Sequence, residues 1–332
     1  MGHRIVIFDR QSRFVKGLAD YLNKKYTDYF ETMAFDDAEK LLGFLERNTC
    51  RICFVSRSGL DAYQTEKLIQ SEIPIVYISN DKRQEGIYQF QSVEKIAKDI
   101  IEQYIERFSD ADLSSGNKKR DKKHRWIGFY SPCRCYLQSS IALAMGQILG
   151  EGKNVLYINF EAFSGLSYIL QKEFDQDLAD LIFYLKEDET KMQLRMQSML
   201  HLVGKLYYLP PVSSFLDLQD VSSENWKQFF TYITEQVDMD VIILDLSELV
   251  NGFVDMLSVC DEIYTCYDEN DVSYGKLQQY KHFLACMQKQ DILDKTKEYR
   301  IPQIQNIPKQ ANMFVSGSLK NIVKAIMEDK QE

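Results

Sequence analysis

Short apolar runs alternate with amphipathic stretches along the first part of the chain. The apolar runs are rich in β-branched and aromatic residues, as buried strands are, and they lie at 4–8, 30–35, 51–55, 74–78 and 86–90. Apolar positions at helical spacing are found in the stretches 12–26, 36–47 and 92–108. Repeats of this kind over residues 1–108 predict a parallel sheet with helices on both faces.

A second pattern of the same type begins at residue 126. Strand-like runs lie at 126–130, 154–160, 205–211, 240–248 and 261–267, and helix-like stretches lie at 138–152, 190–203, 223–237 and 273–288. The fold class is therefore α/β, with two doubly wound parallel-sheet domains over 1–108 and 126–332. In such sheets, ligands bind at the carboxyl ends of the strands.

The segment 109–125, SDADLSSGNKKRDKKHR, separates the two patterns and is almost free of apolar residues. Its Ser, Gly and charged residues are typical of a linker between domains. The basic run from Lys118 to Arg125 is either a solvated part of that linker or a contact for an acidic lipid or partner.

Composition narrows the class of protein further. The 332 residues are 45% hydrophobic and 27% charged, with a net charge of −9, which is typical of a globular protein and argues against nucleic-acid binding. No apolar run approaches the roughly 18 residues of a membrane span, and the N-terminus does not resemble a signal peptide, so we expect a cytoplasmic protein. The seven scattered cysteines are expected to be reduced, and Cys53 of the CxxC pair with Cys50 is expected to be a buried strand thiol rather than part of a redox or metal site.

The stretch FYSPCRCYLQSSIALAMGQILG, residues 129–150, has the layout of a phosphate-binding loop. A strand over 126–130 leads through the connection SPCRCYLQ into a helix, as in a Walker A segment. The buried strand DVIILD ends at Asp245, which has the position of a Walker B aspartate. We therefore ask whether this edge of the sheet binds a nucleotide.

The frame around this loop resembles the MinD/ParA-type deviant Walker ATPases. In that family the loop reads Lys-Gly-Gly-x-Gly-Lys-Thr/Ser-Thr. Here the two lysine positions carry Cys133 and Gln138, and the three glycine positions carry Arg134, Cys135 and Leu137. Ser139 and Ser140 match the hydroxyl pair, and the acidic pair after the second strand falls at Asn159 and Glu161. The resemblance thus implies an altered nucleotide pocket made of Arg134, Gln138, Ser139, Ser140, Asn159, Glu161 and Asp245.

The substitutions predict a pocket that has lost its catalytic chemistry. The loop needs some positive φ values, and a side chain in a left-handed conformation costs roughly 1–2 kcal/mol. Both lysine charges are missing, and Gln138 offers only a neutral donor. Ser139 and Asp245 stay as weak candidates for a Mg²⁺ site, so binding of ATP with Mg²⁺ is left open while hydrolysis is not expected.

The front domain resembles a response-regulator receiver that has lost its own chemistry. Such receivers use an acidic pair, a phospho-accepting aspartate, a hydroxyl and a lysine. The matching positions here are Asp9 with Arg10, then Ser56, Ser79 and Gln89. Because a serine cannot form the acyl phosphate, the resemblance implies a pseudo-receiver whose surface serves docking or dimerisation. The alternative for Asp9 is a plain residue at the end of a strand or in a cap.

A receiver-like domain ahead of a MinD/ParA-like domain resembles the TadZ/CpaE family of Flp (tight-adherence) pilus assembly. This resemblance implies a non-catalytic localisation and scaffold protein, a homodimer, whose partners belong to the pilus secretion machine. The alternative is an ATP-switched MinD/ParA-like ATPase with an atypical loop, and a transcription-linked regulator is a further one. The amphipathic stretch 319–332 ends in acidic residues, so we expect its apolar positions to pack on the sheet and any contact with a membrane to be indirect.

Overall fold

The computed structural model describes residues 3–108, 123–187, 189–302 and 307–328. The chain forms two compact units. Unit 1 comprises Met1–Asn117 together with Thr190–Ser198, and unit 2 comprises Lys118–Glu189 together with Met199–Glu332. Most of the predicted linker, 109–122, lies outside the described residues. The short segment Thr190–Ser198 therefore belongs to unit 1, although its neighbours in sequence belong to unit 2.

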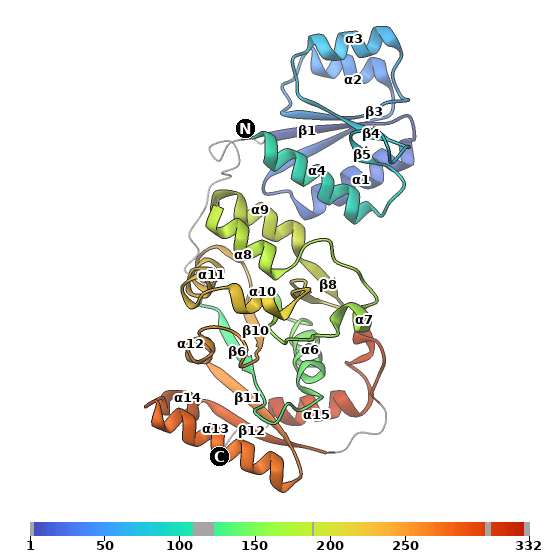
Figure 1. Ribbon diagram of the computed structural model, residues 1–332. Coiled ribbons are helices and arrows are strands. Elements are labelled where there is room, and N and C mark those ends of the chain that lie inside the picture. The colour runs from blue at the N-terminus through green and yellow to red at the C-terminus, as the bar shows by residue number, and fades with distance from the viewer. Residues whose placement is uncertain (1–2, 109–122, 188, 303–306, 329–332) are drawn as a thin grey trace. The chain divides into compact units, whose positions relative to one another are not determined.

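Unit 1 is built around a five-stranded parallel sheet (Figure 1). Its elements are β1 (His3–Phe8), α1 (Ser12–Lys25), β2 (Phe30–Phe35), α2 (Ala38–Leu45), β3 (Ile52–Ser56), α3 (Ala62–Gln70), β4 (Ile75–Ser79), β5 (Ile87–Tyr88), α4 (Val93–Arg107) and α9 (Glu189–Met199). The strand order is β2-β1-β3-β4-β5. This is the order of a flavodoxin-like doubly wound sheet, and its switch point lies at the carboxyl ends of β1 and β3.

Helices cover both faces of this sheet, as the alternating pattern predicts. On one face, Val15 and Leu18 of α1 and Ile100 of α4 pack on Ile5 and Ile7 of β1. Leu194 of α9 belongs to the same core cluster. On the other face, Leu41 of α2 and Leu68 of α3 pack on Val6 and Cys53. The helix α3 carries a capping box between Asp61 and Gln64, a signal that the hydrophobic pattern alone did not bring out.

Unit 2 contains a seven-stranded sheet in the order β12-β11-β6-β10-β7-β9-β8. Its elements are β6 (Arg125–Phe129), α6 (Gln138–Leu149), β7 (Val155–Asn159), α7 (Leu166–Leu170), α8 (Leu178–Glu187), β8 (His201–Val203), β9 (Leu206–Tyr208), α10 (Phe215–Asp220), α11 (Ser223–Gln236), β10 (Val241–Asp245), α12 (Phe253–Val259), β11 (Glu262–Asp268), α13 (Asp271–Cys286), α14 (Gln290–Asp294), β12 (Thr296–Ile301), the 3-10 turn η1 (Ala311–Met313) and α15 (Gly317–Glu328). The prediction of α/β order is confirmed for this half, and β12 is a strand that the pattern did not indicate.

The sheet of unit 2 is mixed, which corrects the prediction of a purely parallel sheet. β8 pairs antiparallel with β9, and Val203 lies opposite Leu206 across the two residues between them. Gly204 has a φ of 61°, which a glycine adopts without strain and which lets the chain reverse. The stretch 190–203 was predicted to be one helix, but α9 ends at Met199 because the chain turns into this hairpin.

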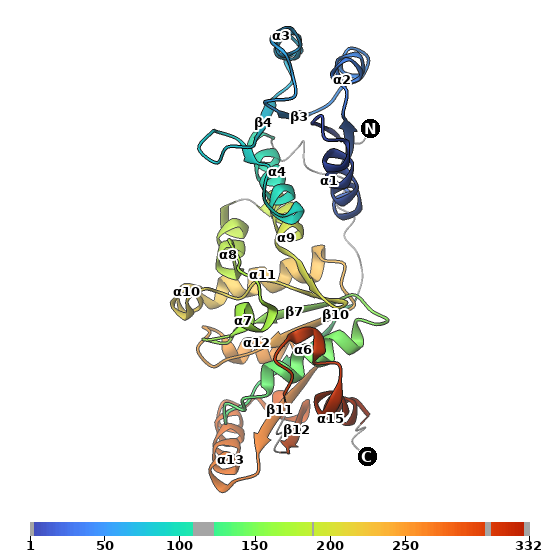
Figure 2. The ribbon, with the colours of Figure 1, turned by 90° about the vertical axis from the view of Figure 1, so that its right-hand side faces the viewer.

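The core of unit 2 lies on both sides of the sheet. The helices α6 and α15 lie side by side on one face (Figure 2), where Leu319, Val323 and Ile326 join the core cluster with Ile127 and Ile243. This packing of the C-terminal helix is what its amphipathic pattern predicts. On the other face, Trp126 and Phe160 contact Phe230 and Trp226 of α11 edge-on. No helix in the described ranges is long and apolar enough to cross a membrane.

Candidate functional site

The register of the sheet in unit 2 gathers the predicted site residues at one edge. β10 runs parallel between β6 and β7, so that Asp245 lies in register with Phe129 and Asn159. The loop after Phe129 leads directly into α6, whose first residue is Gln138. The carboxyl ends of parallel strands and the start of the following helix meet at such an edge. The residues that the sequence pattern singled out in three separate segments are therefore neighbours.

Gln138 occupies the centre of this edge. Its Nε2 donates to Asp245 Oδ1 at 2.7 Å, to Glu161 Oε1 at 3.1 Å and to the carbonyl oxygen of Leu246 at 3.1 Å. The side chain is buried, with 4% of its surface exposed. An amide nitrogen has only two protons, so these three acceptors share them. The amide protons of Gln138 are thus used in hydrogen bonds within the chain.

Asp245 is fully buried, and both of its carboxylate oxygens accept hydrogen bonds. Its Oδ2 accepts from the hydroxyl of Tyr157 at 2.6 Å and from Asn159 Nδ2 at 2.8 Å, while Ser139 hydrogen-bonds the same carboxyl group. Asn159 Nδ2 also contacts the Tyr157 hydroxyl at 2.9 Å. Burial raises the pKa of Asp245, and the hydrogen bonds from these side chains and from Gln138 oppose that rise.

Further carboxylates give the pocket a negative character. Burial, with added repulsion from Asp245 and Glu248, raises the pKa of Glu161 to about 7. Arg134 forms an ion pair with Glu248 at 3.0 Å, although both side chains are largely exposed. The loop itself carries no other cation, since residues 131–137 read SPCRCYL. A phosphate group placed here would face acidic side chains and meet little positive charge.

The loop backbone donates its N–H groups within the loop. Arg134 N–H bonds the carbonyl of Ser131 at 3.0 Å, Cys135 N–H bonds Ser131 Oγ at 3.0 Å, and Gln138 N–H bonds the carbonyl of Cys135 at 3.1 Å. A phosphate-binding loop works through N–H groups that point at the ligand. These three donors are satisfied without one.

Arg134, Cys135 and Leu137 stand at positions where the sequence resemblance predicts positive φ values. Only Arg134 has one. Arg134 has a φ of 56°, in the left-handed region, whereas Leu137 has a φ of −96°. Cys135 is not among the positive-φ residues of the described chain. The loop thus has one left-handed residue, Arg134, and its Cys135 and Leu137 are buried in the core of unit 2.

The residues at this edge of the sheet do not fit a bound ATP with Mg²⁺. Both oxygens of Asp245 already accept hydrogen bonds, and its side chain has no exposed surface. Ser139 is half-buried and bonds the same aspartate, and Ser140 lies beside it in the first turn of α6. Within the described ranges, no three His, Cys, Asp or Glu side chains are grouped so that they could hold a metal ion.

Unit 1 has a smaller arrangement of the same kind. Asp9 follows β1 and is 4% exposed. Its Oδ1 accepts from the backbone N–H of Gln11 at 2.7 Å, and its Oδ2 accepts from Gln89 Nε2 at 3.2 Å. The first bond is an Asx-type turn, so the interpretation of Asp9 as a strand-end cap has direct support. The second joins residues that are 80 positions apart in the chain.

The other two positions of this predicted site bond elsewhere. Ser56 Oγ lies 3.3 Å from Ser58 Oγ. The hydroxyl of Ser79 donates to Gln84 Oε1 at 2.9 Å and accepts from the N–H of Asp81 at 3.1 Å. Unit 1 thus brings Asp9 and Gln89 together, and uses Ser56 and Ser79 to order the loops that follow their strands.

Sequence reasoning missed Tyr157, which contributes the shortest bond to Asp245. A signal existed, because residues two apart on a strand share a face and Asn159 had been singled out.

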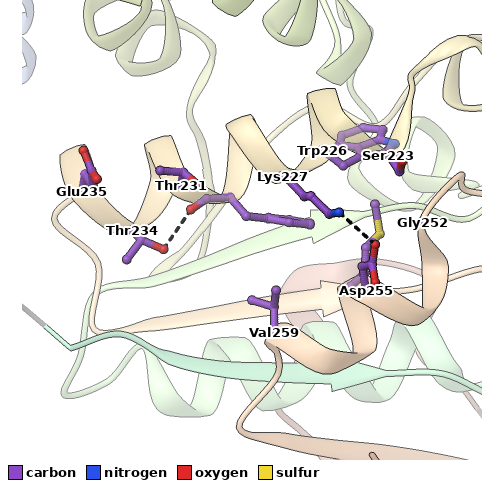
Figure 3. Close-up of a pocket in the computed structure, with 11 residues that line it drawn as sticks. Ser223, Trp226, Lys227, Thr231, Thr234, Glu235, Gly252, Asp255 and Val259 are labelled. Carbon is purple, nitrogen blue, oxygen red and sulfur yellow. Dashed lines mark hydrogen bonds and ion pairs between the residues drawn. The ribbon is translucent and has the colours of Figure 1, made fainter. Parts of the chain in front are cut away.

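The sequence also gave no indication of a pocket of about 440 Å³ between α11 and α12 (Figure 3). Phe230 and Met256 contribute apolar surface to this pocket, and Lys227 forms an ion pair with Asp255 at 3.4 Å beside it. None of its lining residues belongs to the Asp245 cluster.

No protein-family model matches this chain, and neither does any curated protein sequence. Among solved structures, it is similar to a ParA family ATPase from Chlorobium tepidum TLS at 17% identity, with a TM-score of 0.49 over 62% of this chain and 99% of that one. A plasmid partition protein from Borrelia burgdorferi shows 13% identity and a TM-score of 0.45, over 63% of this chain and 100% of that one.

A third similar structure is the MinC:MinD cell division protein complex of Aquifex aeolicus. Here the identity is 18% and the TM-score is 0.40, over 52% of this chain and 67% of that one.

Proposed function

We propose that this protein is a non-catalytic localisation and scaffold protein built on a MinD/ParA-like ATPase fold. The observation that carries the proposal is the hydrogen-bonded cluster of Gln138 with Asp245. It fills the place where a nucleotide's phosphates and metal ion would bind, and it satisfies the polar groups there with the protein's own side chains. A site of this kind stabilises one conformation and does not switch with nucleotide hydrolysis.

The sequence resemblance supplies the biological setting of this proposal. A receiver-like domain followed by a MinD/ParA-like domain is the arrangement of the TadZ/CpaE proteins of Flp pilus assembly. We assign the protein to the same task, in which a homodimer marks the position where the secretion machine assembles and binds other proteins of that machine. The bond between Gln89 and Asp9 supports the view that unit 1 is a pseudo-receiver, because Gln89 stands near the position of the receiver lysine.

Titration calorimetry with ATP and ADP in the presence of Mg²⁺ tests the proposal. We expect no binding heat at millimolar nucleotide, because the loop N–H groups and Asp245 already have partners. The Gln138→Lys variant restores one lysine and should still fail to bind, since the conformation of the loop is unchanged. Micromolar binding by the unaltered chain, lost in Ser139→Ala, would favour the ATP-switched alternative.

The oligomeric state gives a second and independent test. A scaffold dimer should sediment with the same mass in the presence and absence of ATP with Mg²⁺. The matched variant Gln138→Ala removes the central amide and should leave that mass unchanged. Dimer formation that required ATP would contradict the proposal and would place the protein with the nucleotide-switched ATPases.

A further inference from the structure

The thiols of Cys50 and Cys53 lie next to each other in unit 1. Their sulfur atoms are 3.5 Å apart. Cys53 is the second residue of the central strand β3 and is fully buried, whereas Cys50 lies before the strand and is half-buried. Neither the resemblance to receivers nor the proposed scaffold role uses this pair.

The surroundings make the two thiols chemically unequal. The hydrogen bond from Cys53 holds the pKa of the Cys50 thiol below its ordinary value. The same bond and the burial of Cys53 raise the pKa of Cys53 well above its ordinary value. Thiolates, and not thiols, are the nucleophiles in disulfide chemistry. Cys50 is therefore the attacking sulfur, and it is also the one of the two that solvent reaches.

Other cysteines of the chain have different partners. Cys133 donates its S–H to the carbonyl of Ser273, with 3.1 Å between donor and acceptor. The exposed thiol of Cys286 lies 3.4 Å from His282 Nε2. Cys286 is thus exposed but has a histidine, and not a second thiol, as its hydrogen-bond partner. It therefore serves as the internal control for an accessible thiol that is not part of a pair.

We infer that Cys50 and Cys53 form a redox-active dithiol whose substrate is a low-molecular-weight disulfide such as oxidised glutathione. The Cys50 thiolate attacks one sulfur of the glutathione disulfide, which forms a mixed disulfide on Cys50 and releases one glutathione thiolate. The released thiolate takes the proton of Cys53. The Cys53 thiolate then attacks the sulfur of Cys50, forms the Cys50–Cys53 disulfide and releases a second glutathione thiolate, which is protonated by water. The pair loses two electrons, and the glutathione disulfide gains them.

The geometry requires only a small movement for this closure. A disulfide has a sulfur–sulfur length of about 2.05 Å, so the two atoms approach by about 1.5 Å. Cys50 can supply this movement because it precedes β3, whereas Cys53 is fixed by pairing with Val6 and Ile75 on the two neighbouring strands. The accessible residue is thus also the one that is freer to move.

The test is carried out on the full chain with defined mixtures of reduced and oxidised glutathione. After acid quenching and alkylation, trypsin cleaves at Arg51, between the two cysteines. A Cys50–Cys53 disulfide therefore appears in mass spectrometry as a linked pair of peptides, Asn48–Arg51 and Ile52–Arg57. We expect this linked pair, with no glutathione left on Cys50, and its loss on reduction.

Matched variants separate the two steps of the reaction. Cys53→Ala should accumulate glutathione on Cys50, because the resolving thiol is absent. Cys50→Ser should leave Cys53 unmodified, and Cys286→Ser should form the linked peptides as the parent chain does. The inference is overturned if Cys50 of the parent chain retains glutathione, or if Cys286 is modified while Cys50 and Cys53 stay reduced. Both readouts come from the parent chain and do not depend on the folding of a variant.

Discussion

Each unit places a buried aspartate at the carboxyl end of a strand and a glutamine amide beside it, yet the two sites are held very differently. Asp9 receives one backbone N–H and the amide of Gln89 at 3.2 Å. Asp245 receives the amide of Gln138 at 2.7 Å, and Tyr157 and Asn159 of the neighbouring strand β7 donate to it as well. Burial penalises the charge of a carboxylate, and Asp245, which has no exposed surface, accepts from more donors than Asp9, which is 4% exposed.

Other acidic residues near Asp245 add to this difference. In unit 2, burial raises the pKa of Glu161, and the charges of Asp245 and Glu248 raise it further. Gln138 thus bridges two acidic groups with one neutral amide. The amide of Gln89 donates to one acid, Asp9, whereas the amide of Gln138 donates to two, Asp245 and Glu161.

Removal of each aspartate should produce the largest contrast. Asp245→Ala leaves the buried donors of Tyr157, Asn159 and Gln138 without their acceptor, so it should lower the stability of unit 2 by about 3–5 kcal/mol. Asp9→Ala should cost unit 1 about 1–2 kcal/mol. Urea unfolding measures both, because the two tryptophans of the chain, Trp126 and Trp226, lie in unit 2 while circular dichroism follows the whole chain. Equal losses in the two units would break the comparison.

Removal of each glutamine side chain should give a smaller contrast in the same direction. Gln138→Ala deprives Asp245 and the Leu246 carbonyl of a donor, at a cost of about 2–3 kcal/mol. Gln89→Ala removes one longer hydrogen bond and should cost about 1 kcal/mol. The same two spectroscopic probes apply. A larger effect of Gln89→Ala would show that unit 1 depends on its amide more than its geometry indicates.

The raised pKa of Glu161 predicts how unit 2 responds to pH. Its ordinary pKa of 4.5 rises to about 7 in the fold, so the folded state binds a proton more tightly than the unfolded state. Stability should therefore be highest below pH 4.5 as far as this group is concerned, and should fall as the pH rises to 7. Asp245, whose pKa is also raised, contributes in the same direction.

The isosteric variant Glu161→Gln isolates this contribution. It keeps an acceptor for Gln138 and removes the charge, so its unfolding midpoint should vary less between pH 5 and 8 than that of the parent chain. At pH 8 it should be more stable by about 1–2 kcal/mol, a value discounted because part of the side chain is exposed. Identical pH profiles for the two proteins would refute the assigned environment of Glu161.

The left-handed residue of the loop should give the smallest effect. Arg134→Ala removes the exposed ion pair with Glu248, worth about 0–1 kcal/mol, and keeps a side chain at a φ of 56°. Arg134→Gly removes the same ion pair and relieves the strain, so it should be more stable than Arg134→Ala by about 1 kcal/mol. Thermal unfolding of the two variants at one pH measures this difference. A more stable alanine variant would argue against a left-handed Arg134.

The sequence by itself determined the alternation of strands and helices over most of both halves and the segments that carry the candidate site. Period-two and helical patterns are local properties, so β2 was found at 30–35, and the loop before α6 was found from its spacing. The absence of lysine and glycine from residues 131–137 could be read directly. The same local signals failed at 190–203, where a hairpin interrupts the helical pattern, and at the edge strand β12.

Only the tertiary structure decided how the altered site is filled. The bond between Gln138 and Asp245 joins residues 107 positions apart, and Tyr157 reaches the same carboxylate from a third segment. Whether a buried carboxylate is satisfied depends on which donors the sheet register brings within about 3 Å, and no local pattern encodes that register. The segment 190–198 likewise belongs to unit 1 through contacts distant in sequence. Local sequence preferences determine which segments form strands and helices. Packing and hydrogen bonding between distant segments determine which of these elements, and which side chains, contact each other.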